Sequence, residues 1–269
     1  MAANETERER WNDEQRYAVW PKRERLTSEV TPLLIEALAP KSGEKILEIG
    51  SGGGRAALAA AEAVGDEGSL VGLDISGGLT RLARERADAA GAANVRFVVG
   101  DAQTDRVDGG PFDAAMSQFG VMFFDDPVAA FANIGDQLRP DGRIVFACWQ
   151  PLEANPWFFF DAVAEFIPTP PPVEGVVPAG PFALGDAART TDLLLRAGFE
   201  EVRCTPRELV AIAPEDALLD EVQLRLMGVP EQKLARAMEA AKAYMSRFRV
   251  DDERSRFPLA ILIVQAVRR

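Results

Sequence analysis

Between residues 45 and 149 the chain alternates apolar runs of strand length with segments of helical periodicity. This alternation is typical of a parallel sheet whose two faces are covered by helices. Right-handed crossovers make such a sheet doubly wound. We therefore expect an α/β fold built on a doubly wound, mostly parallel sheet. The predicted strands are Lys45–Ile49, Leu70–Leu73, Val95–Val99, Phe112–Met116 and Arg143–Trp149, and the predicted helices are Arg55–Val64, Gly78–Ala90 and Pro127–Leu138.

The segments on either side of this core follow other patterns. The first 40 residues have helical spacing over Glu14–Trp20 and Ser28–Leu38, with Pro21 as an expected break. After residue 150 a connection rich in Pro and Gly includes Pro170–Pro172 and Gly175. It is compatible either with a lid or pocket wall or with packing at the domain edge. Further on we expect a helix, a strand, a broken helical stretch and a final strand: Asp186–Ala197, Phe199–Cys204, Asp216–Phe248 with a break at Gly228–Pro230, and Leu259–Val267.

The composition excludes several classes of function. The chain has 269 residues, with 42 acidic and 30 basic side chains and no histidine. The acidic excess argues against a nucleic-acid partner, because binding phosphates requires Lys and Arg. Without histidine, serine-hydrolase triads and His-based metal sites are impossible, and we expect no metal. Cys148 and Cys204 are predicted to be buried, reduced thiols.

The N-terminal sequence and the apolar runs bear on location. The first 20 residues are rich in Glu and Arg and lack the apolar centre of a secretory signal. No run approaches the roughly 18 apolar residues that a membrane-spanning helix needs. We therefore expect a cytoplasmic protein with no membrane insertion.

A glycine cluster directly follows the first predicted strand, in the order Gly50, Ser51, Gly52, Gly53, Gly54. Such a loop before a helix lets a ligand approach the backbone and offers unpaired N–H groups to an anion. Dinucleotide-binding proteins use the same device, and Gly52, Gly54 and Ala57 fit their pattern loosely. Glu48 separates the two possibilities, because a carboxylate repels a pyrophosphate but attracts the ammonium of an amino-acid-bearing ligand.

Two further acids end the second and third strands. Asp74 lies where an adenosine ribose would bind, and Asp101 where an adenine amino group would donate. A single Asp at such a position is often a helix cap, and Asp74 could simply cap the helix after it. Three acids at successive strand ends favour a ligand, since parallel sheets bind ligands at their carboxyl edge.

These motifs, together with Phe112–Asp126 and Leu138–Phe146, resemble those of class I S-adenosylmethionine-dependent methyltransferases. The likeness is to the branch of quinone-biosynthesis and natural-product enzymes, and it covers mainly residues 40–150. It implies a seven-stranded sheet with an antiparallel last strand and S-adenosylmethionine as cofactor. Asp141 departs from the family, which usually has glycine there, but Asp tolerates turn geometry.

The resemblance also implies a set of cofactor-binding residues. Glu48, Gly50 and Gly52 would face the methionine end, and Asp74 and Ile75 the ribose and adenine. Asp101 and Ala102 would contact the adenine, and Ser117, Gln118 and Phe119 would lie along the cofactor near its methyl group. With the rest of the glycine loop, the full predicted set is Glu48, Gly50, Ser51, Gly52, Gly54, Asp74, Ile75, Asp101, Ala102, Ser117, Gln118 and Phe119.

The domain organisation is expected to follow the same division. We predict one methyltransferase domain over residues 1–269, with N-terminal helices in 1–40 and a cofactor-binding core in 41–150. Residues 151–185 and 207–256 are predicted insertions on the substrate side. Aromatic residues in the N-terminal helices and after the fourth and fifth strands predict an apolar acceptor pocket. They are Trp11, Tyr17, Trp20, Phe119–Phe124, Trp149 and Trp157–Phe160.

The expected reaction is methyl transfer to a small, apolar or aromatic molecule, at oxygen or carbon. No catalytic residue is predicted. Without histidine the available bases are carboxylates, Tyr17 and Tyr244, and the acids that are candidates by position, Glu24, Asp125 and Asp126, are expected on the surface. An acidic acceptor would need little from such a base. The alternatives are an NAD(P)-dependent oxidoreductase, a nucleic-acid methyltransferase and a non-catalytic cofactor-binding scaffold. The acceptor, pathway and oligomeric state are not predicted.

Overall fold

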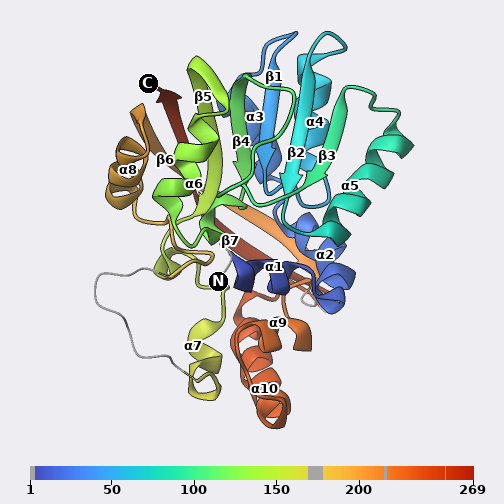
Figure 1. Cartoon of the computed structure of the whole chain (residues 1–269). Coiled ribbons are helices and arrows are strands. Elements are labelled where there is room, and N and C mark those ends of the chain that lie inside the picture. The colour runs from blue at the N-terminus through green and yellow to red at the C-terminus, as the bar shows by residue number, and fades with distance from the viewer. Residues whose placement is uncertain (1–3, 169–177, 215–216, 252) are drawn as a thin grey trace.

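The computed structural model describes residues 4–168, 178–214, 217–251 and 253–269. Its centre is a seven-stranded sheet in the order β3-β2-β1-β4-β5-β7-β6 (Figure 1). The strands β1 to β5 pair in parallel, and β7 lies antiparallel between β5 and β6. This confirms the predicted α/β sheet and its antiparallel last strand. The strands are β1 Lys45–Ile49, β2 Ser69–Asp74, β3 Val95–Val99, β4 Phe112–Gln118, β5 Leu138–Trp149, β6 Phe199–Pro214 and β7 Arg254–Arg268.

Helices cover both faces of the sheet. In Figure 1, α6 lies in front of the strands, while α3 and α4 lie behind them. The helices α3 and α4 pack on each other, and α6 packs on α8. The bounds of the helices that pack on the sheet are α3 Val30–Leu38, α4 Arg55–Val64, α5 Gly77–Ala90, α6 Pro127–Gly135 and α8 Ala187–Arg196.

A second group of helices lies beyond the carboxyl ends of the strands (Figure 1). Two come from the N-terminus, α1 Glu5–Trp11 and α2 Glu14–Leu26. Three come from the C-terminal half, α7 Phe160–Val163, α9 Glu221–Leu226 and α10 Leu234–Met245. Short 3₁₀ turns occupy Val121–Phe123, Leu152–Ala154, Ala164–Phe166, Glu231–Lys233 and Ser246–Phe248.

The predicted end of the second helix at Pro21 is wrong. Helix α2 continues through Pro21 to Leu26, although proline cannot supply the N–H of its turn. Tertiary contacts beyond the proline compensate, because Arg23 contacts Asp220 and Glu24 accepts a hydrogen bond from Arg86.

The strands β6 and β7 are longer than predicted. They pair as far as Pro214 and Arg254, well past the end of β5 at Trp149, so they extend beyond the rest of the sheet. The predicted insertion 207–256 therefore loses residues 207–214 and 254–256 to the sheet. The sequence hides this because β6 is an edge strand, where charged residues and proline are tolerated. Two predictions fall partly outside the described residues: the connection that includes Pro170–Pro172 and Gly175, and the first residue, 216, of the predicted helical stretch.

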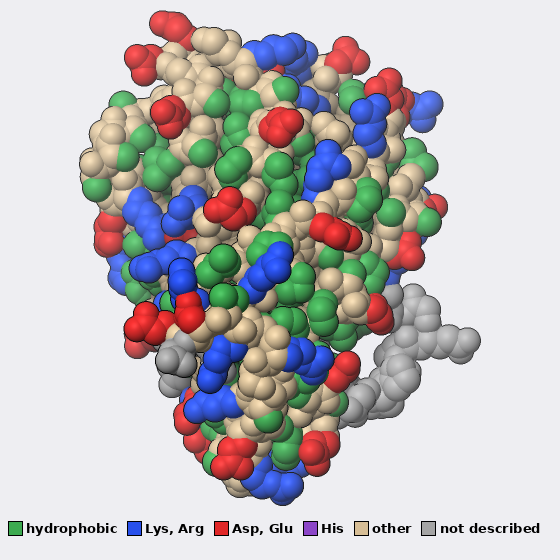
Figure 2. All heavy atoms as spheres, turned by 180° about the vertical axis from the view of Figure 1, so that it is seen from behind, with side chains coloured by type: hydrophobic (Ala, Val, Ile, Leu, Met, Phe, Trp, Pro, Cys, Tyr) green, Lys and Arg blue, Asp and Glu red, His purple; other side chains and the backbone are tan. Residues whose placement is uncertain are grey.

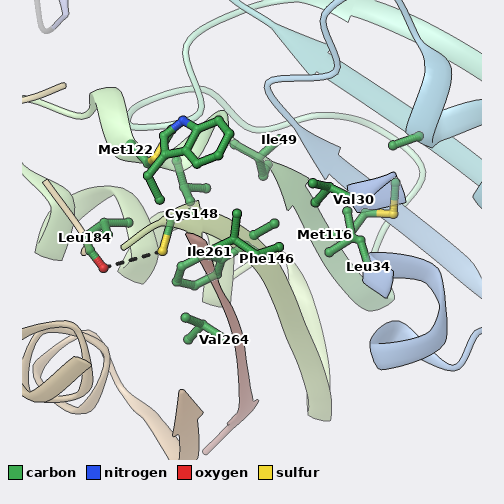
Figure 3. Close-up of a cluster of buried hydrophobic side chains, with 14 of the residues drawn as sticks. Val30, Leu34, Ile49, Met116, Met122, Phe146, Cys148, Leu184, Ile261 and Val264 are labelled. Atoms are coloured by element: carbon green, nitrogen blue, oxygen red, sulfur yellow. Dashed lines mark hydrogen bonds between the residues drawn. The ribbon is translucent and has the colours of Figure 1, made fainter. Parts of the chain in front are cut away.

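The core lies between the sheet and its covering helices. Figure 3 shows part of it: buried side chains of the sheet such as Phe146 and Val264, with the thiol of Cys148 pointing to Leu184. The thiol of Cys148 is buried and donates to the carbonyl of Leu184 at 3.4 Å, and burial raises its pKa. The other cysteine, Cys204, is only half-buried, so the prediction of two buried thiols is correct for Cys148 alone.

Candidate active site

The glycine loop after β1 is confined on two sides. Gly50 and Gly52 have left-handed backbones, with φ of +66° and +52°. A Cβ on Gly50 would lie 2.7 Å from the Cα of Gly120, and one on Gly52 would lie 2.7 Å from the ring of Trp20. Both the backbone conformation and the space therefore require glycine at these two positions.

Asp74 holds this loop to the end of β2. Its carboxylate accepts hydrogen bonds from the backbone N–H of Gly52 at 2.7 Å and of Ser76 at 2.8 Å. The cap of helix α5 is Ser76, whose side chain accepts from the N–H of Leu79, so Asp74 is not the cap. Burial raises the pKa of Asp74, and the two backbone hydrogen bonds oppose that rise.

Glu48 is the most deeply buried acid at this edge of the sheet. Its side chain is 1% exposed, and Oε2 has no hydrogen-bond partner. Burial and then the Asp74 carboxylate raise its pKa well above the usual value for Glu, while the backbone N–H of Ala57 opposes them. A buried carboxyl with a free oxygen is costly unless a cationic partner arrives.

Asp101, at the end of β3, is linked to the N-terminus. Its Oδ1 accepts from the side chain of Asn4 at 2.8 Å and from the N–H of Gln103 at 2.9 Å, whereas its buried Oδ2 has no partner. Asn4 also exchanges two hydrogen bonds with Asp125. The start of helix α1 is thereby fixed over the carboxyl edge of the sheet.

These residues line a cavity of about 280 Å³ that lies between the sheet edge and the second group of helices. Seven buried side-chain polar atoms lack a hydrogen-bond partner in the described part of the chain, and six belong to residues of this cavity. Unpaired polar atoms gathered in one cavity indicate a polar ligand, because each costs free energy when it stays unpaired. They belong to Trp20, Arg23, Glu24, Glu48, Ser51 and Asp101.

The structure brings ten of the twelve predicted cofactor-binding residues to the cavity. Gly54 and Ser117 are not among its lining residues. Gly54 caps helix α4 and faces Phe97 and Ala83. The hydroxyl of Ser117 donates to the carbonyl of Ile49 at 2.7 Å and accepts from the N–H of Gly120, so it joins β1 to the loop after β4.

Another part of the cavity wall is aromatic. The rings of Phe119 and Trp149 stack with centroids 4.2 Å apart, and Trp157 meets both Trp149 and Phe158 edge-on. We call this wall the aromatic half: Phe119, Met122, Phe123, Trp149, Trp157, Phe158, Pro181, Leu218 and Gln223. The strand-edge half consists of Glu48, Gly50, Ser51, Gly52, Asp74, Ile75, Asp101 and Ala102.

Three predicted pocket aromatics lie elsewhere: Tyr17, Phe159 and Phe160, of which Phe159 is buried in the core outside the cavity lining. Tyr17 packs near Gly78, with the guanidinium of Arg81 over its ring, and Phe160 is exposed at the surface. Sequence reasoning also left several lining residues out of the pocket. Arg23, Glu24 and Thr27 follow Trp20 at helical spacing, a signal that could have placed them on the same face of α2. Leu218 and Gln223 had no such signal.

The predicted candidates for a base have structural partners. Asp126 caps helix α6, Asp125 binds Asn4, and the hydroxyl of Tyr244 donates to the carbonyl of Pro156. Glu24 lines the cavity but accepts from Arg86 at 2.9 Å, with Arg55 3.7 Å away. Its environment is therefore that of an ion-pair partner rather than of a free base.

Residues 46–142 match the model of the methyltransferase domain family. An aklanonic acid methyltransferase from a Streptomyces strain is 38% identical over 42% of this chain, and the match spans only about half (51%) of that relative. The nocamycin O-methyltransferase of Saccharothrix syringae is 31% identical over 67% of this chain and 68% of its own length. The chain belongs to the class I S-adenosylmethionine-dependent methyltransferases.

A solved structure supports the same assignment at the level of the fold. The YcgJ protein of Bacillus subtilis superposes with a TM-score of 0.62 at 16% identity, over 90% of this methyltransferase and 99% of YcgJ. S-adenosylmethionine is the cofactor of the family, so the NAD(P)-dependent alternative is wrong. Among the described residues, no helix of this methyltransferase is both long enough and apolar enough to cross a membrane.

Proposed function

We propose that this methyltransferase transfers a methyl group from S-adenosylmethionine to the oxygen or carbon of an apolar, largely aromatic small molecule. The observation that supports this most directly is that one cavity contains both the polar strand-edge half and the aromatic half. When bound, S-adenosylmethionine supplies an electrophilic methyl group on a positively charged sulfur.

The unpaired atoms of the strand-edge half fit the cofactor group by group. The free oxygen of Glu48 is suited to the ammonium, and that of Asp101 to the adenine amino group. Asp74 would receive the ribose hydroxyls, with Ile75 and Ala102 against the adenine. The indole N–H of Trp20 and the hydroxyl of Ser51 are unpaired donors beside the glycine loop, where they suit the methionine carboxylate.

The aromatic half would position the acceptor and exclude water, which is the main requirement of a displacement at a methyl group. The rings of Phe119, Trp149 and Trp157 offer flat apolar area to a ring system. The nocamycin relative acts at oxygen, which favours an oxygen acceptor here as well. Five lining carboxylates and an acidic chain argue against a nucleic-acid acceptor: Glu7, Glu24, Glu48, Asp74 and Asp101.

The proposal is tested by incubating the protein with S-adenosylmethionine labelled in its methyl group. A panel of phenols, aromatic carboxylic acids, quinols and simple amines serves as acceptors, and mass spectrometry detects the labelled product. We expect label in aromatic oxygen or carbon acceptors. Tight binding of S-adenosylhomocysteine without turnover of any acceptor would instead support the non-catalytic scaffold.

A further inference from the structure

One cation of the cavity has no role in the assignment above. Arg23 lines the cavity, its side chain is 15% exposed, and its Nε–H is buried without a partner. One terminal nitrogen, Nη2, lies 3.4 and 3.5 Å from the two carboxylate oxygens of Asp220, which are long distances for hydrogen bonds. Burial lowers the pKa of Arg23, with Asp220 acting against it. The guanidinium is thus desolvated and incompletely neutralised, a condition that favours an incoming anion.

The position of Arg23 separates it from the cofactor. Trp20 and Glu24, on the same face of helix α2, are fixed over the glycine loop, where a Cβ on Gly53 would meet both. Arg23 instead reaches Asp220, the cap of helix α9. Leu218 and Gln223, on either side of Asp220, line the aromatic half.

Two other polar side chains near this wall, Gln118 and Asp220, are already engaged. Gln118 accepts from Thr31 at 2.8 Å and donates to the carbonyl of Thr27 at 3.1 Å. Asp220 accepts from the N–H of Gln223 at 2.6 Å, which draws its carboxylate toward the helix start. An acceptor with an anionic oxygen would find its unpaired donor in Arg23.

We propose that Arg23 recognises an anionic oxygen, a carboxylate or phenolate, on the methyl acceptor and thereby selects acidic aromatic substrates. This inference rests on the proposed function and narrows its substrate class. Arg23 would act on binding and orientation. It would also keep the acceptor oxygen deprotonated, which agrees with a site whose candidate bases lie outside the cavity lining or, for Glu24, in an ion pair.

The test compares two probes of the same shape, 2-naphthoate and 2-naphthamide. Each is titrated by calorimetry into the full-length protein saturated with S-adenosylhomocysteine. Wild type should bind the acid at least about tenfold more tightly than the amide, as expected of a charge-assisted pair. Arg23→Gln should bind the two within about twofold of each other, and Arg23→Lys should keep part of the preference.

Arg25→Gln is the matched control, because Arg25 is exposed on the same helix and does not line the cavity. It should keep the full preference, and all variants should bind S-adenosylhomocysteine as wild type does. Equal binding of the probes, or binding of neither, in wild type would overturn the inference. So would an Arg23→Gln variant that prefers the acid or that loses cofactor affinity, since the second result assigns Arg23 to the methionine carboxylate. Failure of wild type to bind S-adenosylhomocysteine would contradict the proposed function instead.

Discussion

The strand-edge half of the cavity is held together by backbone hydrogen bonds, whereas the aromatic half is a packing of rings from distant segments. Asp74 binds two N–H groups of its neighbouring loops, and Ser117 ties β1 to the loop after β4. In the aromatic half, Trp149 ends β5, while Trp157 and Leu218 come from the segments after β5 and β6. The first half is specified by local motifs and the second by tertiary packing.

The face of the molecule seen in Figure 2 does not repeat this division. Figure 2 shows basic, acidic and apolar side chains interspersed over the face opposite to that of Figure 1. The separation into a polar and an aromatic side is a property of the cavity. Changes in the strand-edge half should therefore alter cofactor affinity. Changes in the aromatic half should leave it intact, except at Phe119, which is predicted to lie along the cofactor.

The largest effect is expected from Gly50→Ala. The added Cβ carries the left-handed strain of about 1–2 kcal/mol, and it also meets the Gly120 backbone. We expect S-adenosylhomocysteine affinity to fall by about thirtyfold or more, since overpacking adds about 1–3 kcal/mol. Gly43→Ala is the matched control, because Gly43 also has a positive φ but no atom within 4 Å of the added Cβ. Equal loss of affinity in both variants would contradict this account, because it would mean that backbone strain and not the contact with Gly120 causes the loss.

Glu48→Gln should weaken S-adenosylhomocysteine binding by about 10- to 100-fold, the range of a hydrogen bond to a charged group. The same change should raise the melting temperature of the cofactor-free protein, since it removes a buried carboxyl next to Asp74. Differential scanning calorimetry and titration would measure the two effects on one sample. A variant that is both weaker in binding and less stable would contradict this trade-off.

The raised pKa of Glu48 also predicts a pH dependence. A carboxyl whose pKa is higher in the folded protein stabilises the fold below its unfolded pKa, and this contribution is lost as pH rises through the folded pKa. The cofactor ammonium favours the ionised form, so binding should release a proton where Glu48 is still protonated. Affinity should then increase with pH through this range. Calorimetry in buffers of different ionisation enthalpy measures the release, which should disappear in Glu48→Gln.

The smallest effect is expected from Ser117→Ala. Its hydroxyl bonds Ile49 and Gly120 rather than facing the cavity. The free energy of unfolding should fall by about 0.5–1.5 kcal/mol, while cofactor affinity changes by less than about threefold. Chemical denaturation and titration would check both. A large loss of affinity at unchanged stability would return Ser117 to the cofactor site.

The contrast between the halves also explains what the sequence could predict. Glu48, Asp74 and Asp101 lie at or just after the carboxyl ends of apolar strands, and parallel strands bring these ends together, so the three positions were predictable. That Gly54 and Ser117 do not line the cavity was not predictable, because it depends on how the packed fold orients each residue. The spacing of Arg23 from Trp20 could have placed it in the lining, but its contact with Asp220, 197 positions away, was not predictable.

The predicted ends of two elements were wrong for the same reason. Helix α2 passes through Pro21 because partners distant in sequence hold its far end. Strand β6 continues past Cys204 because β7 pairs with it as far as Pro214. The local helix or strand propensity of a segment does not reveal such contacts with residues distant in the sequence.

The central claim, that one cavity has a cofactor side and an acceptor side, is tested most directly by titrating S-adenosylhomocysteine into three proteins. Wild type should bind it, and Asp74→Ala should lose about 1.5–3 kcal/mol of binding free energy through its missing acceptors. Trp157→Ala, in the aromatic half, should bind it as wild type does. An unchanged affinity in a folded Asp74→Ala, or an equal loss in Trp157→Ala, would contradict the division of the cavity.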